Sequence, residues 1–262
     1  MNGEIFQICM IVSAARKALK SKKKIVFTED EFVDSIEFQF LPQKKLFHTN
    51  KCTACNIVEW YEICCDRGVS DYQMICPDKV NDRQLLGFAN TSRASVLTIY
   101  NNHETTYWTA TWDYQRDKNK WKIIYTENRW DQASDGKLEY RNNSHDFKKT
   151  LDEIANFADL IGFKNFGDIF RSAFGVMAGD IEIPTTRSNG RTIQLPQIAD
   201  DKKRIFYAAL TADVFGAMGS WNDSPPYYAH EMGLDQRYEE LSDELLRQIR
   251  LAMLYSINED NA

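Results

Sequence analysis

The chain lacks the sequence features of membrane proteins and of several enzyme classes. None of its 262 residues lies in an apolar run long enough to span a bilayer. There is no phosphate-binding loop, because Gly216 and Gly219 lack both the lysine of such a loop and a preceding strand. A Gly-x-Ser-x-Gly nucleophile elbow is missing too, and no two histidines have the spacing of a helical zinc protease. No enzyme signal rises above background.

The chain also has no excess of positive charge. Its net charge is -6 and its isoelectric point is about 5.4, so its average surface repels nucleic acid and anionic membranes. The single basic run comprises Lys20 and residues 22–24. We interpret this run as the solvated end of a helix. We therefore expect neither nucleic acid nor an anionic membrane as a partner.

The N-terminal segment does not have the order of a secretory signal. Its basic residues follow the apolar part, and Glu4 interrupts the start. Apolar residues recur instead at helical spacing, which predicts an amphipathic first helix: Ile5, Ile8, Ile11, Val12, Ala15 and Leu19. We expect a cytoplasmic protein.

Five of the six cysteines lie within 25 residues: Cys52, Cys55, Cys64, Cys65 and Cys76. The "CTAC" turn offers two thiols, so a tetrahedral zinc site completed by the later cysteines or by His48 is one interpretation. Adjacent cysteines, however, cannot easily bind one ion together, and free cysteine commonly behaves as a small apolar core residue. We favour reduced core thiols and no cofactor, with structural zinc as the open alternative.

The N-terminal half contains the strand-like sequences. Alternation through Ile36 and Phe38 predicts one strand, and a short helix is expected near residues 53–65. Four further runs are rich in aromatic and β-branched residues and predict an antiparallel meander: residues 83–90, 94–101, 104–115 and 120–128. In the third run Trp108, Trp112 and Tyr114 share one face, which could hold a ligand.

The pattern changes to helical spacing after residue 145. Helices are expected in residues 147–161, near residues 165–177, through residues 205–214 and over residues 238–257. We predict an α+β fold in which an antiparallel sheet in residues 1–145 packs against a helical region of residues 146–262 as one compact unit.

The segment "VFGAMGSWNDSPPYY", residues 214–228, is the least ordinary part of the chain. Gly216 suits the end of a helix and Gly219 a second sharp turn. Asn222 and Asp223 form turns readily, and two prolines stiffen the exit. These turns leave the Trp221 side chain with little conformational freedom. We interpret it as a buried anchor, and the alternative is a residue that contacts a ligand or partner. The predicted binding residues are Trp221, Asn222 and Asp223, of which the latter two face solvent if the tryptophan is buried.

One resemblance rests on "FGAMGSWND" and the following "YEELSDELLRQIRLAMLYSIN", which together cover about the last fifth of the chain. These residues resemble the C-terminal signature of small bacterial proteins, some of the immunity type from polymorphic toxin systems. The resemblance implies a cytoplasmic, non-catalytic binding protein whose acidic surface neutralises a toxin. The alternative is an enzyme or zinc-dependent module that uses the cysteines between Cys52 and Cys76 or the aromatic face of the sheet.

Overall fold

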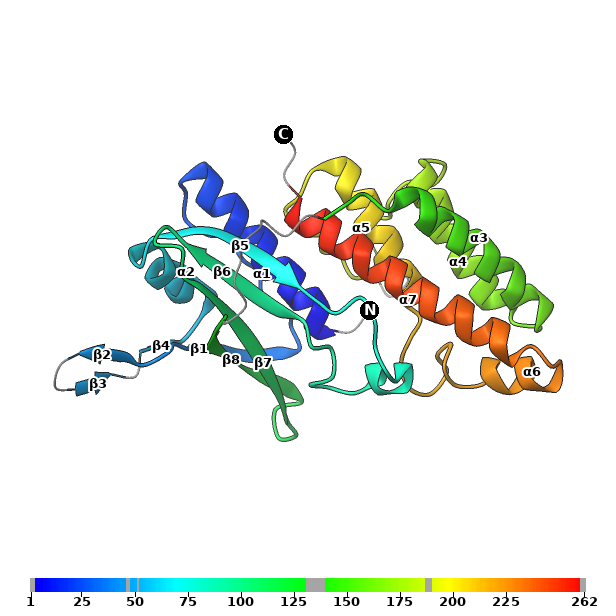
Figure 1. Cartoon of the computed structure of the whole chain (residues 1–262), viewed down its shortest axis with the longest axis horizontal. Coiled ribbons are helices and arrows are strands. Elements are labelled where there is room, and N and C mark those ends of the chain that lie inside the picture. The colour runs from blue at the N-terminus through cyan, green and yellow to red at the C-terminus, as the bar shows by residue number, and fades with distance from the viewer. Residues whose placement is uncertain (1–2, 46–47, 51, 131–139, 187–189, 260–262) are drawn as a thin grey trace.

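The computed structural model describes residues 3–45, 48–50, 52–130, 140–186 and 190–259 of the chain. Its N-terminal half contains a sheet and two helices, and its C-terminal half is helical (Figure 1). The elements of the first half are α1 (Gly3–Ser21), β1 (Val33–Gln39), β2 (Gln43–Lys45), β3 (His48–Asn50), β4 (Thr53–Ala54), α2 (Ile57–Asp66), β5 (Val69–Ile75), the 3-10 helix η1 (Arg83–Gly87), β6 (Ser95–Tyr100), β7 (Thr105–Gln115) and β8 (Lys120–Arg129). Those of the second half are α3 (Ser144–Leu160), α4 (Lys164–Ala178), α5 (Asp200–Ala212), α6 (Pro225–Glu231) and α7 (Asp235–Asn258).

The main sheet has six strands in the order β4-β1-β8-β7-β6-β5. Strands β5 to β8 form an antiparallel meander, in which β6, β7 and β8 correspond to the last three of the four expected strands. The α+β class is thus confirmed, but the sheet is mixed, because β1 pairs with β8 in parallel. Parallel neighbours need a long connection between them, and here the intervening chain supplies α2 and the rest of the sheet.

Helices α1 and α2 cover the same face of this sheet. Trp60 of α2 stacks on Phe38 of β1 with ring centroids 4.8 Å apart, and Phe38 in turn stacks on Tyr125 of β8. The hydroxyl of Tyr125 donates a 2.7 Å hydrogen bond to the amide oxygen of Gln7 in α1. These aromatic side chains are fully buried, so their packing supplies the core of the sheet region.

One expected strand is not a strand in the structure. The run expected as a first meander strand, residues 83–90, forms η1 and an exposed turn, because the Asp82 side chain caps the backbone N–H of Gln84. Leu85 and Phe88 of this run are 50% and 60% exposed, so their apolar character does not reflect burial in a sheet. The first strand of the meander is instead β5, which the pattern analysis did not identify.

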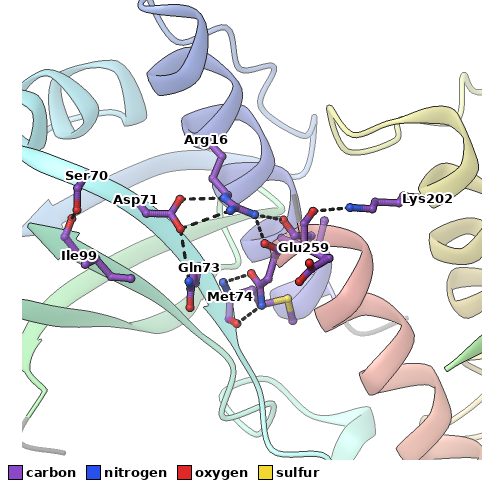
Figure 2. Close-up of polar contacts among 10 residues, drawn as sticks. Arg16, Ser70, Asp71, Gln73, Met74, Ile99, Lys202 and Glu259 are labelled. Atoms are coloured by element: carbon purple, nitrogen blue, oxygen red, sulfur yellow. Dashed lines mark hydrogen bonds and ion pairs between the residues drawn. The ribbon is translucent and has the colours of Figure 1, made fainter. Parts of the chain in front are cut away.

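The helical region joins the sheet region through the C-terminal end of α7 (Figure 2). Arg16 of α1 forms an ion pair with Asp71 of β5 at 3.0 Å and donates to the carbonyl oxygen of Ile257 at 2.9 Å. The Asn258 side chain accepts from the backbone N–H of Met74 and donates to its carbonyl oxygen, both at 2.7 Å. Because β5 is an edge strand, this amide occupies backbone groups that the sheet leaves unpaired.

Candidate functional site

Trp221, the centre of the predicted binding segment, is completely buried among α4 and α7. Its indole N–H donates to the hydroxyl of Ser242 at 2.8 Å, and its carbonyl oxygen accepts from the hydroxyl of Tyr238 at 2.8 Å. Its ring lies edge-on to Phe166 and Phe170, at centroid distances of 5.2 and 5.5 Å. In this conformation the ring offers no surface to a partner, and its contacts are those of a core anchor.

Asn222 and Asp223 lie at the surface of the same loop but face different surroundings. The half-buried Asn222 donates from its amide to the carbonyl oxygen of Arg83 at 2.9 Å, which ties the loop to η1. The exposed Asp223 accepts a 2.8 Å hydrogen bond from the backbone N–H of Gly219, which has a φ of +78°. The structure therefore does not bring the three predicted residues to one surface. Partner contact by Asn222 and Asp223 stays a prediction.

The helix that precedes this loop ends earlier than expected. Helix α5 stops at Ala212, and Gly216 is not in the left-handed region, so it is not the expected helix cap. Its surroundings show another role. A Cβ atom on Gly87 would lie 2.6 Å from the backbone nitrogen of Ala217 and 2.8 Å from the carbonyl carbon of Gly216. The η1 loop and the loop after α5 thus touch backbone to backbone at a glycine that has no room for a side chain.

The aromatic face of the sheet runs from the core to the surface at this junction. Along β7, Trp108 is fully buried, Trp112 is half-buried and Tyr114 is 42% exposed. Trp121 of β8 lies between the last two, with ring centroids 5.8 Å from Trp112 and 5.0 Å from Tyr114. The β7–β8 hairpin extends past the N-terminal end of α1 (Figure 1), which leaves this end of the face partly uncovered. At this end of the face, Trp112, Tyr114 and Trp121 are therefore partly exposed.

Two cavities adjoin at Gly3, Trp112 and Trp121. The first, which we call the outer cavity, has a volume of about 320 Å³. Its remaining lining residues come from the start of α1, the η1 loop and the loop after α5: Glu4, Leu86, Gly87, Phe88, Ala89, Phe215, Gly216 and Ala217. The second, the inner cavity, has about 220 Å³ and lies toward residues 27–33. Residues 215–217 of the predicted segment and Trp112 and Trp121 of the aromatic face, far apart in sequence, therefore line one cavity, whereas the predicted binding residues Trp221, Asn222 and Asp223 do not line it.

Three exposed apolar side chains stand on the two loops beside the outer cavity. Met218 is 94% exposed, Phe88 60% and Leu85 50%. We call these three residues the apolar rim. Sequence analysis missed them, because an apolar residue between glycines in a turn-rich segment is compatible with burial as well as with exposure. Nearly the whole Met218 side chain is in contact with water, and only a second molecule that covers it would remove this contact.

The cysteines do not form the site that their spacing suggested as an alternative. Cys64 is buried, whereas its neighbour Cys65 is exposed. Cys52 lies just before β4, Cys55 lies between β4 and α2, and Cys76 lies just after β5. Burial raises the pKa of Cys76 to about 11 and also raises the pKa of Cys64, which disfavours the thiolate that binds metals. In the described parts of the chain, no three His, Cys, Asp or Glu side chains are placed to hold a metal ion. The His48 side chain lies outside the described residues.

A buried carboxylate in the sheet also went unpredicted. Glu127 of β8 accepts from the backbone N–H of Leu41 at 2.8 Å, from Thr106 at 2.9 Å and from Arg67 at 3.1 Å. Ile123, Tyr125 and Glu127 are every second residue of β8, so Glu127 lies on the same core-facing side of the strand as the other two. This alternation is the sequence signal that could have identified it. Both of its oxygens are engaged by protein groups, so it joins the strands and is not positioned as a free acid or base.

No helix in the described ranges is long and apolar enough to cross a membrane. No protein-family model matches the chain, and comparison with curated proteins and with solved structures finds no significant match.

Proposed function

We propose that the protein works by binding another protein and carries out no chemistry of its own. The observation that carries the proposal is the apolar rim, in which Met218, Phe88 and Leu85 project from two loops beside a cavity. Methionine and aromatic residues are enriched in the centres of protein–protein interfaces, where their burial contributes most of the binding energy. The outer cavity beside the rim offers a place for a side chain of the partner.

The loops that carry the rim are already fixed, which favours binding. The hydroxyl of Thr91 donates to the carbonyl oxygens of Leu85 and Phe88 at 2.9 and 2.7 Å. The hydrogen bond from Asn222 to Arg83 and the close approach at Gly87 join this loop to the one that bears Met218. A surface ordered before binding loses little conformational entropy when its partner arrives.

The charge distribution supports a partner with a basic surface. Residues 146–262 contain 19 acidic and 12 basic side chains, whereas residues 1–145 contain 19 and 20. The helical region thus carries a net charge of -7 and the sheet region +1. Complementary charge speeds association and selects partners. With the immunity-type resemblance of the segment around Trp221, this leads us to propose a toxin as the partner.

The test compares two double variants in cells that naturally produce the chain. Phe88→Ser/Met218→Ser changes the apolar rim. Val58→Ser/Leu160→Ser is the matched control, since Val58 and Leu160 are 41% and 58% exposed on α2 and α3. We expect quantitative affinity capture to enrich one protein with the wild type and the control but not with the rim variant. With both proteins purified, the rim variant should raise the dissociation constant at least about 30-fold.

The toxin assignment has its own readout. The captured protein, expressed alone, should arrest growth, and co-expression of the wild-type chain but not of the rim variant should restore it. Equal affinity of rim variant and wild type for the purified partner would refute the proposed contact surface. A partner that is harmless when expressed alone would refute the toxin assignment and leave the binding surface standing.

A further inference from the structure

Aromatic side chains make up a large part of the lining of the inner cavity. It has a volume of about 220 Å³ and lies between the first turns of α1, residues 27–33 and the β7–β8 hairpin. Five aromatic residues line it: Phe6, Phe27, Phe32, Trp112 and Trp121. The planes of Trp112 and Trp121 meet at 67°, so the two rings form adjoining walls. Gly3 borders the same walls, and a Cβ atom there would lie 4.0 Å from the Trp112 ring.

Among the described residues that line this cavity, a single one has an ionisable side chain, the acidic Asp30. Asp30 accepts a 3.0 Å hydrogen bond from the backbone N–H of Phe32, which fixes its carboxylate beside the rings, and it forms no ion pair with any described residue. The neighbouring Glu31 instead forms a 2.8 Å ion pair with Arg191, whose guanidinium lies over the Phe32 ring. The Arg191 guanidinium, which lies beside this loop in space, is therefore engaged by a different carboxylate.

The remaining polar side chains of the cavity are neutral: Gln7, Thr28 and Gln194. Gln7 is 93% buried, and its amide oxygen already accepts from Tyr125. A neutral apolar ligand would gain nothing from the Asp30 carboxylate, and an anion would be repelled by it. A positive group gains from both the carboxylate and the faces of the rings, since the ring quadrupole attracts cations.

We propose that the inner cavity binds a small organic cation, an alkyl- or arylammonium ion whose apolar body lies against Trp112 and Trp121 and whose charge faces Asp30. The site is separate from the apolar rim, which lies beside the outer cavity, and the proposal does not require a protein partner.

The probes are benzylammonium and its neutral near-isostere benzyl alcohol, measured at pH 7 by calorimetry and by protein NMR. We expect benzylammonium to bind saturably, about ten-fold more tightly than the alcohol. Asp30→Asn should bring the two affinities within about two-fold, because it removes the one charged side chain among the described residues that line the cavity. Glu29→Gln is the matched control, since it removes a neighbouring carboxylate that does not line the cavity and should preserve the preference. Both positions are exposed, and unchanged melting temperatures would show that the variants fold.

A second variant tests the aromatic walls. Trp121→Leu should weaken the binding of both probes, because both use the ring faces. Equal affinity of the wild type for cation and alcohol, an unchanged preference in Asp30→Asn, or no saturable binding of benzylammonium would each overturn the proposal. None of these results depends on the partner capture, so the two proposals fail or succeed separately.

Discussion

At the scale of single residues, Trp221 anchors the helical region through its ring and two hydrogen bonds. Replacing it with alanine empties a fully buried aromatic site and leaves the Ser242 hydroxyl without its donor. We expect Trp221→Ala to lower the free energy of unfolding by about 3 to 5 kcal/mol. Urea denaturation followed by circular dichroism measures the loss.

Trp221→Phe is the control for this prediction. It keeps most of the ring packing against Phe166 and Phe170 but removes the indole N–H. Its cost should be smaller, about 1 to 3 kcal/mol. A Trp221→Ala variant as stable as the wild type would show that the ring is not a core anchor.

The residues around Trp221 also show what sequence alone can tell at this scale. Gly219, Asn222 and two prolines restrict the loop, and from that restriction a buried tryptophan was the favoured interpretation. The apolar rim could not be predicted in the same way, because a methionine between two glycines is compatible with burial or exposure. Only the close approach of Gly87 to Ala217, a contact between distant segments, decides which way the loop faces.

At the scale of elements, the contact between α7 and β5 joins the two regions. Asn258 pairs with both backbone groups of Met74, and it is 3% exposed. Asn258→Ala leaves a buried N–H and a buried carbonyl oxygen without these partners, so we expect a loss of about 2 to 4 kcal/mol in the free energy of unfolding.

Asn128→Ala is the matched control for that substitution. Its amide also contacts strands, donating to Thr109 and to the carbonyl oxygen of Thr126, but these bonds lie on the uncovered face of the sheet. It should cost less than about 1 kcal/mol. Equal losses for the two variants in the same denaturation assay would contradict the role given to Asn258.

Periodicity predicted the elements that bury one regular face. Helix α1, strands β6 to β8 and helix α7 all show it. Strand β5 was missed because a register irregularity between Val69 and Asp71 interrupts its alternation, which then continues only through Tyr72 and Met74. The parallel pairing of β1 with β8 was missed for another reason: strand order depends on long-range packing, which a local pattern does not contain.

At the scale of the whole molecule, one buried core includes side chains from both regions. Ile8 of α1, Leu245 and Ile257 of α7 and Phe206 of α5 belong to the same cluster. The ion pair and hydrogen bonds of Arg16 connect the same helices to β5. Because both regions contribute side chains to this core, unfolding of one region exposes the core side chains of the other, and the two should unfold together.

We therefore expect one cooperative thermal transition, with a calorimetric enthalpy equal to the van't Hoff enthalpy. Addition of a strong chelator should leave the midpoint unchanged, because the core extends over both regions and does not depend on the cysteines between Cys52 and Cys76. Two resolved transitions would show that the regions fold independently. A midpoint lowered by the chelator would restore the structural zinc interpretation.

The central claim is that the chain binds a protein partner through the apolar rim, and site-specific photo-crosslinking in living cells tests it most directly. A benzophenone-bearing phenylalanine replaces Met218 in one variant and Val58 of α2 in another, since both side chains are exposed. We predict that the probe at position 218 yields one covalent adduct with a single protein, that the probe at position 58 does not, and that Phe88→Ser weakens the adduct. An adduct of equal yield from both positions, or none from position 218 while the captured partner is present, would contradict the account.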